Sequence, residues 1–336
     1  MLTQVRLAVT DRSEVGAARR MAMELSGSIG LDETQAGKVG LCVTEAATNI
    51  IKHAGSGQIV LRALEADGAA GLEILALDRG PGIANLQASL RDGVSTAGSC
   101  GTGLGALARL SNVFDAYAPL GRGSAMRMEI WSRPPRASTE IQLGAVCLAK
   151  TGETIPGDGW GVESAGGRHT ILVADGLGHG PEAAKAAYAA LRVLRSRPEE
   201  EPGQIIDACH RALAATRGAA VAVCRIAPGH GAGSFAGVGN ISARVEAGEA
   251  RRQLASHNGT VGHNVRRVQQ FEFPWARDAL LILHSDGLAT RWNLSEYPGL
   301  ASRHPGLIAG VLYRDHERGR DDVTVLVVRS GAGAWT

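Results

Sequence analysis

The chain has 336 residues, of which 44% are hydrophobic and 20% charged, and its formal net charge is +2. This length predicts about two domains, and the composition excludes a disordered or fibrous protein. The small net charge, without a basic stripe, argues against a nucleic-acid partner. No stretch has the roughly 18 apolar residues of a membrane span, and no signal-peptide pattern is seen, so we expect a cytoplasmic protein without a membrane partner.

The first part of the chain shows two helical patterns followed by strands. Apolar periodicity predicts helices at about 14–25 and 34–53, and strands near 59–64 and 72–78. A glycine-rich loop then leads to a helix beginning near Gly103 and a strand ending at Trp131. The polar segment 132–139 contains two prolines and interrupts regular structure. We therefore expect a first domain at 1–132, a linker at 133–139 and a second domain at 140–330.

The second part of the chain consists of strand-like runs of Val, Ile, Leu and Ala separated by glycine turns. Two helical stretches are expected there, at 181–197 and 202–217. No internal repeat of solenoid spacing is present. This pattern predicts a sheet-rich α+β layout.

Within the predicted helix 34–53, Glu45 and Asn49 lie about one turn apart and so share a face. A carboxylate and a carboxamide together can hold a water and a magnesium ion, because hard cations prefer oxygen ligands. Many helices carry a Glu and an Asn at this spacing on a solvated face. For the pair alone, a solvated face is a more frequent explanation than a magnesium site.

Two later loops strengthen the case for a nucleotide pocket. Asp78 ends an apolar strand, and the turn after it contains Gly80 and Gly82, where backbone can approach a ligand closely. An acidic group in this place can accept a hydrogen bond from an adenine amino group. A second glycine-rich loop opens a helix, as phosphate-binding loops do, and consists of Gly101, Thr102, Gly103, Leu104 and Gly105. The ordered set of three motifs is far more specific than any one of them.

These motifs resemble the GHKL ATPase superfamily and, within it, the anti-sigma serine kinases of bacterial partner switching. The resemblance covers residues 1–131 and implies a Bergerat α/β sandwich that binds ATP with Mg²⁺. It implies Glu45 as the general base for the acceptor serine, Asn49 as the magnesium ligand and Asp78 as the adenine contact. It further implies that the glycine loop 101–105 lies under the phosphates and that 82–99 is a mobile lid.

Four aspartates in the second part stand at the edges of apolar strands, and three of them precede glycine: Asp158, Asp175, Asp286 and Asp321. Each Asp-Gly alone is most often a turn. Carboxylates converging on one site repel one another unless divalent cations compensate their charge. Oxygen ligands favour Mg²⁺ or Mn²⁺, and two such ions can activate water for phosphomonoester hydrolysis.

The order of these motifs resembles the phosphatase 2C superfamily, in its SpoIIE-type bacterial branch, over residues 140–329. The resemblance implies an α-β-β-α sandwich with two Mn²⁺ or Mg²⁺ ions. The implied metal ligands are the four aspartates and the backbone carbonyl of Gly176. Asp322 is expected to orient the last ligand or a water. His179 is a candidate acid for the leaving serine oxygen, although a structural or solvent-facing role is at least as frequent for such a histidine.

Together the two resemblances imply a bifunctional partner-switching regulator, a serine/threonine kinase-like domain joined to a protein phosphatase. Its expected partner is a small STAS-type phosphoprotein resembling anti-sigma antagonists, with a sigma factor or an upstream sensor as further candidates. The alternative is a phosphatase whose first domain only binds ATP and a partner. An intact Glu45 favours a kinase, because a pure binding module needs no base. The arginine that clamps substrate phosphate in larger eukaryotic phosphatases has no identifiable counterpart in the sequence.

Overall fold

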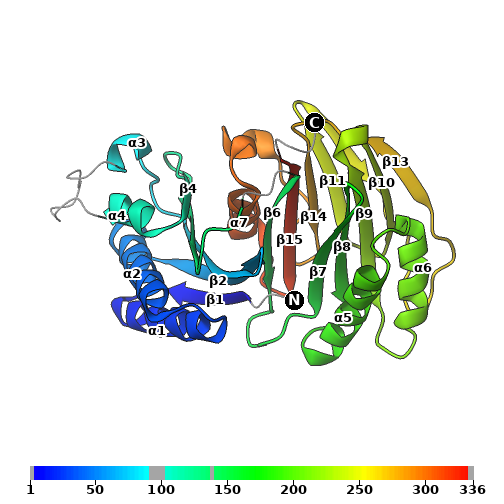
Figure 1. Ribbon diagram of the computed structural model, residues 1–336, viewed down its shortest axis with the longest axis horizontal. Helices are drawn as coiled ribbons and strands as arrows, with labels where there is room; N and C mark the ends of the chain where they lie inside the picture. Colours follow the sequence, from blue (N-terminus) through cyan, green and yellow to red (C-terminus); the bar gives the residue numbers. More distant parts are fainter. Residues whose placement is uncertain (1–3, 91–102, 137–139, 332–336) are drawn as a thin grey trace. The chain divides into compact units, whose positions relative to one another are not determined.

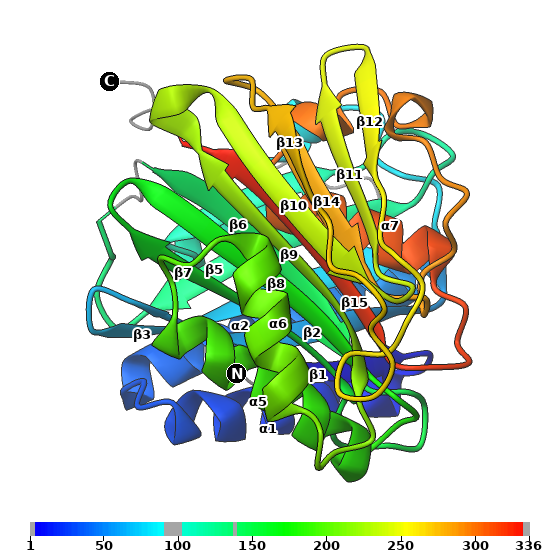
Figure 2. The same ribbon diagram turned by 90° about the vertical axis from the view of Figure 1, so that its right-hand side faces the viewer.

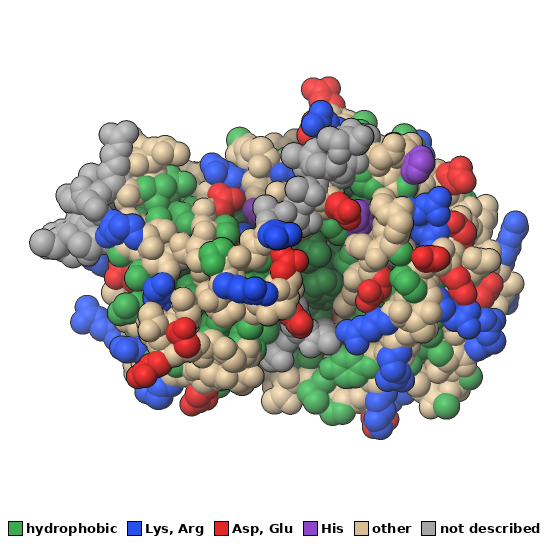
Figure 3. All heavy atoms as spheres, in the orientation of Figure 1, with side chains coloured by type: hydrophobic (Ala, Val, Ile, Leu, Met, Phe, Trp, Pro, Cys, Tyr) green, Lys and Arg blue, Asp and Glu red, His purple; other side chains and the backbone are tan. Residues whose placement is uncertain are grey.

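A computed structural model describes residues 4–90, 103–136 and 140–331 (Figure 1). These residues form two compact units. The first comprises the described residues up to 136 together with Tyr297–Arg303, and the second comprises the others. No helix in the described ranges is long and apolar enough to cross a membrane. On the face shown in Figure 3, basic and acidic side chains are interspersed.

The first unit contains one five-stranded antiparallel sheet in the order β1-β2-β3-β5-β4. Its strands are β1 (Gln4–Val9), β2 (Gly57–Ala66), β3 (Ala69–Asp78), β4 (Val113–Tyr117) and β5 (Ser124–Trp131). Its helices are α1 (Arg12–Ser28), α2 (Glu33–Asn49), η1 (Ile50–Ala54), α3 (Leu86–Ser89) and α4 (Gly103–Leu110). Apolar side chains of α1, α2 and α4 share a core with alternate residues of the sheet, including Val43, Leu107, Ile59 and Met128.

The starts of the two long helices follow from their capping residues. Asp11 caps α1 and forms a capping box with Glu14, while the side chain of Asp32 accepts a hydrogen bond at the start of α2. The predicted helix 34–53 is confirmed up to Asn49, after which the chain continues as the π-helix η1. The wider turn of a π-helix interrupts α-helical spacing directly after Asn49, and such turns are frequent at functional sites.

The second unit contains two five-stranded sheets, in the orders β13-β10-β9-β8-β7 and β12-β11-β14-β15-β6. The strands of the first sheet are β7 (Asp158–Ala165), β8 (Arg168–Gly176), β9 (Ala219–Ala227), β10 (Ala232–Val238) and β13 (Gln270–Pro274). Those of the second are β6 (Ile141–Leu148), β11 (Ser242–Ala247), β12 (Ala250–Leu254), β14 (Leu280–His284) and β15 (Val323–Ser330). The remaining elements along the chain are α5 (Pro181–Ser196), α6 (Pro202–Ala212), η2 (Pro228–His230), η3 (Leu294–Glu296), η4 (Leu300–Ser302) and α7 (Pro305–His316).

The two sheets of the second unit face each other over an apolar core and carry helices on their outer faces. The core between them includes Ile171, Phe235, Leu283 and Leu326. Helices α5 and α6 form a second core with the β8–β9–β10 side, and α7 packs on β6 and β15 (Figure 2). This arrangement confirms the expected α-β-β-α sandwich, and with the first unit it confirms the α+β class.

Some expected elements differ from those observed. The helix expected at 202–217 ends at Ala212, because Leu213 takes the C-cap and the next residues form a turn. The two helices expected in the second part are present as α5 and α6, and α7 is a third that was not expected. All of its residues from Pro305 to Arg314 are buried, so its sequence has no polar face to mark a helical period. Strands β1 and β4 were not expected either.

Candidate active sites

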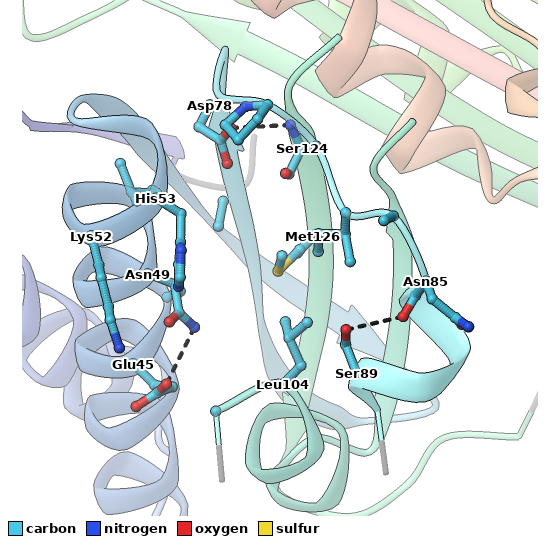
Figure 4. Close-up of a pocket in the computed structure, with 18 of the residues that line it drawn as sticks. Glu45, Asn49, Lys52, His53, Asp78, Asn85, Ser89, Leu104, Ser124 and Met126 are labelled. Carbon is cyan, nitrogen blue, oxygen red and sulfur yellow. Dashed lines mark hydrogen bonds between the residues drawn. The ribbon is translucent and has the colours of Figure 1, made fainter. Parts of the chain in front are cut away.

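A cavity of about 470 Å³ opens in the first unit beside α2 and η1. Its apolar lining includes Ile50, Ala76, Ile83, Leu104 and Met126. Polar groups converge on the same space from several elements, as Figure 4 shows, namely Glu45, Asn49, Lys52, His53, Asp78, Asn85, Ser89 and Ser124. A mostly apolar cavity with a few placed polar groups is the usual form of a small-molecule site.

Glu45 and Asn49 project from one face of α2 into this cavity, as their spacing predicts (Figure 4). Asn49 Nδ2 donates a hydrogen bond to Glu45 Oε1 at 3.2 Å. This bond uses the donor nitrogen of Asn49 and leaves its oxygen outside the pair. A carboxylate and a carboxamide oxygen therefore stand together, which is the donor set that a magnesium ion prefers.

Asp78 ends β3 at the cavity wall, and its position is fixed by backbone groups. Its Oδ1 accepts hydrogen bonds from Gly80 N at 2.8 Å and from Ser124 N at 3.1 Å. Gly82 has a φ of +75°, and a Cβ there would lie 2.2 Å from Pro119 O. A side chain at Gly82 is thus excluded both by backbone conformation and by space.

The glycine loop is described only in part. Gly101 and Thr102 lie outside the described residues, as do positions 91–99 of the expected lid. Gly103 and Leu104 line the cavity, and a Cβ on Gly103 would lie 2.6 Å from Glu45 Oε1. Gly105 is buried in α4. The chain thus brings the start of α4 directly against the Glu45 side chain.

Several residues of this cavity were not expected from the sequence to take part in the site. Lys52 and His53 line it from η1, one turn beyond Asn49, and Ser124 and Met126 line it from β5. The sequence feature that could have identified Lys52 and His53 is their spacing of about one helical turn from Asn49. No comparable signal exists for the β5 residues, because only strand pairing brings Ser124 beside Asp78 and Met126 beside Ala76.

The second candidate site lies where strands of both sheets of the sandwich end. Asp158 begins β7 and is paired directly with Asp175 near the end of β8. Asp286 comes two residues after the end of β14, while Asp321 comes two residues before β15, its antiparallel neighbour. The strand ends therefore place these aspartates at one end of the sandwich. Gly176 follows Asp175, and a Cβ on it would lie 2.1 Å from Ala183 O in α5.

Ser285 joins the two sheets at this end. Its Oγ donates a 2.6 Å hydrogen bond to Asp158 Oδ2 and accepts one from Thr324 N at 2.9 Å. Its own backbone N donates to Thr324 O at 3.1 Å. Ser285 is completely buried and Asp158 is 1% exposed. Ser285 was not among the site residues expected from the sequence.

Asp322 holds the loop that leads into β7. Its Oδ1 accepts a hydrogen bond from Lys150 N at 2.8 Å, and its Oδ2 accepts one from Gly157 N at 2.7 Å. Its backbone N also donates to Asp321 Oδ1 at 2.9 Å. Asp322 therefore contacts Asp321 through its backbone and positions the residues before Asp158 through its carboxylate.

The negative charges of the aspartates in this site repel one another, so that each makes ionisation of its neighbours less favourable. Burial, together with the charges of Asp322 and Asp286, raises the pKa of Asp158. Burial and the charge of Asp158 raise the pKa of Asp175 as well. Asp286, whose Oδ2 accepts a 2.7 Å hydrogen bond from Asn240 Nδ2, also has a pKa raised by burial and by Asp321. Such a cluster is favourable only when protonated or when a cation neutralises it.

The chemistry of this donor set fits hard divalent cations, because every side-chain donor is a carboxylate oxygen. Within the described ranges, no group of three or more Asp, Glu, His or Cys side chains is already arranged around a single point as metal ligands. The carboxylates thus face one site without yet converging on one ion position. Asp158 and Asp175 lie in paired strands, whereas Asp286 and Asp321 lie in the loops next to β14 and β15.

Beside these carboxylates lies a cavity of about 450 Å³, lined by Asp286, Gly287, Arg318, Arg320 and Asp321. His179 lies in the loop after β8, where its Nδ1 is 2.7 Å from Glu153 Oε1. Its side chain is 48% exposed. The expected role of His179 as an acid remains a prediction.

Comparison with known proteins relates the two halves of the chain to two families. Residues 8–130 match the family described as the histidine kinase-like ATPase domain, and residues 165–331 match that of stage II sporulation protein E. The serine/threonine-protein kinase RsbT of Bacillus subtilis is 32% identical over 120 residues, which cover 36% of this chain and 90% of RsbT.

Solved structures show similar folds. A structure from work on the bacterial stressosome is 30% identical, with a TM-score of 0.53, and the match covers 56% of this chain and all of that one. The structure of RsbX in complex with magnesium matches with a TM-score of 0.50 at 20% identity, over 58% of this chain and 98% of the other. The similarity to RsbX, at 20% identity, shows that part of this chain has the same fold as RsbX.

Proposed function

Because the chain belongs to the histidine kinase-like ATPase family of RsbT and continues into a SpoIIE-type phosphatase 2C domain, we propose that it is a bifunctional partner-switching enzyme. The first unit transfers phosphate from ATP to a serine or threonine of a protein. The second removes phosphate from phosphoserine or phosphothreonine with Mg²⁺ or Mn²⁺. The substrate of both units is a small STAS-type antagonist protein.

In the kinase unit, the cavity holds ATP, with Asp78 at the adenine and the start of α4 at the phosphates. Asn49 provides an oxygen for Mg²⁺, and Glu45 takes the proton of the acceptor hydroxyl. The hydrogen bond between Asn49 and Glu45 supports this division of roles, since it sets the base directly beside the metal ligand. An exposed pair on a solvated face would not line a cavity, whereas both residues do.

In the phosphatase unit, Asp158, Asp175, Asp286 and Asp321 hold the cations, with the carbonyl of Gly176. When bound, the cations supply an activated water and neutralise phosphate charge. Ser285 and Asn240 orient Asp158 and Asp286, and Asp322 fixes the loop before Asp158. His179, oriented by Glu153, is the candidate donor of a proton to the leaving serine oxygen.

One observation carries the phosphatase assignment. Aspartates from both sheets meet at one end of the sandwich, where burial and mutual repulsion raise the pKa values of Asp158 and Asp175. Such an arrangement is costly for the fold, and bound cations would offset that cost by neutralising the carboxylates. An acidic patch on a solvated surface would not show this burial.

The kinase assignment is tested by phosphate transfer from labelled ATP to a STAS-type protein. The test uses the Asp286→Asn chain, in which the product is not removed by the phosphatase unit. Glu45→Ala in that background should leave ATP binding within about twofold and lower transfer at least about 100-fold, the scale of general-base catalysis. Asn49→Ala should instead abolish Mg²⁺-dependent ATP binding.

The alternative function makes the first unit an ATP-dependent binding module without transfer. In that case Glu45→Ala and its parent would capture the same protein partner equally well, and neither would label it. A partner labelled by the parent but not by Glu45→Ala excludes this alternative.

A further inference from the structure

Two arginines face the carboxylate site from a single short segment. Arg318 and Arg320 line the cavity of about 450 Å³, together with Asp286, Gly287 and Asp321. The cavity is thus lined both by acidic residues of the candidate metal site and by two arginines. This charge distribution is unlike that of a site that binds cations alone.

The backbone holds this segment firmly against the strand end that carries Asp286. Arg318 N donates to Gly287 O at 2.9 Å, and Ala289 N donates to His316 O at 2.9 Å. Leu288 and Glu317 form an isolated β-bridge between these two bonds. Main-chain hydrogen bonds therefore hold Arg318 beside the residues that follow Asp286, and Arg320 comes two residues later in the chain.

Between the arginines stands Gly319, with a φ of +66°. Glycine adopts this left-handed conformation without the steric cost of a side chain, and the residues on both sides of it line one cavity. Among the described residues, neither guanidinium forms a side-chain hydrogen bond or an ion pair within 4 Å. Asp286 and Asp321 are instead hydrogen-bonded by Asn240 Nδ2 and by the backbone N of Asp322.

We propose that Arg318 and Arg320 bind the phosphate group of the phosphatase substrate. This inference rests on the proposed phosphatase function. A phosphomonoester dianion approaching a cluster of aspartates is repelled unless positive groups stand beside it. Guanidinium groups bind phosphate oxygens through two parallel hydrogen bonds, which also orient the phosphorus for attack by water.

The competing explanation is that the arginines only neutralise the neighbouring carboxylates. The two explanations predict different effects of removing a positive charge. A counter-ion competes with the metal, so its loss should strengthen Mn²⁺ binding and leave the substrate KM unchanged. An arginine that binds the phosphate group contributes to substrate binding, so its loss should raise KM and weaken the binding of inorganic phosphate.

The test compares Arg318→Ala, Arg320→Ala and Arg318→Lys in the full chain, with Mn²⁺ and a phosphoserine protein. We expect each alanine variant to raise KM and the inhibition constant of inorganic phosphate about tenfold, the loss of one charge-assisted contact. For Arg318→Lys, both constants should lie between those of wild type and Arg318→Ala, because lysine keeps the charge but cannot form two parallel hydrogen bonds to phosphate. Arg277→Ala is the matched control, since Arg277 is exposed and precedes β14 whereas Asp286 follows it.

Calorimetric titration of the same proteins with inorganic phosphate gives a readout independent of turnover. An unchanged phosphate affinity and KM in both alanine variants would overturn the inference, and so would tighter Mn²⁺ binding without a change in either. If the wild-type protein hydrolyses no phosphoprotein, the proposed function fails instead, and the phosphate titration still decides whether these arginines bind the anion.

Discussion

Ser285 shows how one hydroxyl can connect two sheets and a reactive site. It donates to Asp158, accepts from Thr324 and stands next to Asp286, so two candidate metal ligands depend on its position. A buried hydrogen bond to a carboxylate is worth more than one between neutral groups. Ser285 therefore positions candidate metal ligands without being one of them.

We predict that Ser285→Ala weakens Mn²⁺ binding about tenfold or more, the usual effect of losing a residue that orients a metal ligand. The free energy of unfolding should also fall by about 1–3 kcal/mol, because Asp158 and Thr324 N lose a buried partner. Calorimetry with Mn²⁺ and denaturant unfolding measure the two effects. Ser295→Ala is the control, since Ser295 is exposed. Unchanged metal affinity in Ser285→Ala would show that Asp158 is held without it.

The sequence reveals some of these residues and hides others for a physical reason. Asp158, Asp175 and Asp286 are visible because each follows or begins an apolar run and precedes glycine. Ser285 is invisible because its partner Asp158 lies 127 residues away. Asp322 was expected from its place beside Asp321 to orient the last ligand or a water, but its hydrogen bonds to backbone groups 165 and 172 residues away could not be predicted from the sequence. Arg318 and Arg320 look like surface charges until the backbone places them beside Asp286.

At the scale of elements, the hairpin of β7 and β8 carries two of the aspartates and also a buried histidine. His169 pairs with Ser164 across the hairpin, its Nδ1 lies 2.8 Å from Ser164 Oγ, and its Nε2 lies 3.6 Å from Glu140 Oε2. Burial lowers the pKa of His169, although Glu140 opposes this effect. The folded state therefore favours the neutral ring.

The lowered pKa of His169 makes the free energy of unfolding depend on pH. Below a pH of about 6.5, the pKa of histidine in the unfolded chain, the unfolded state binds a proton at His169 more readily than the folded state does. The free energy of unfolding therefore decreases as the pH falls below this value. We predict that the stability difference between wild type and His169→Gln narrows from pH 7.5 to pH 5.5. Denaturant unfolding at both pH values measures it, with His230→Gln as an exposed control. A difference that is constant with pH would contradict the assignment.

Helices could be predicted from the sequence where capping residues or an apolar periodicity mark them. A helix that is buried on every face has no such periodicity and was missed. The starts of α1, α5 and α6 follow from a capping box or from a proline at the first turn. Helix α7 was missed because it is apolar on every face from Pro305 to Arg314. The end of α6 was misplaced because the residues after Ala212 keep a helix-like composition while forming a turn.

At the scale of the molecule, each unit has apolar cores of its own. The core of the first unit includes residues from Val9 to Ile130, and the cores of the second include none of these. We predict that fragments separated within 133–138 each unfold cooperatively, because the cut falls between two sets of sheets. Calorimetric melting of both fragments tests this. If neither shows a cooperative transition, the predicted boundary or the two-domain organisation is wrong.

The central claim is that one chain carries two separate phosphate-handling sites, and the Asp286→Asn protein tests it most directly. The substitution keeps size and removes the charge that compensates a divalent cation, while relief of repulsion with Asp321 offsets part of the cost to the fold. The measurement is Mn²⁺-dependent dephosphorylation of a phosphoserine protein, beside ATP binding by calorimetry on the same sample. We predict that hydrolysis falls at least about 100-fold while ATP affinity is unchanged. Full hydrolysis by a folded Asp286→Asn protein would contradict the metal site, and a parallel loss of ATP binding would contradict the separation of the two sites.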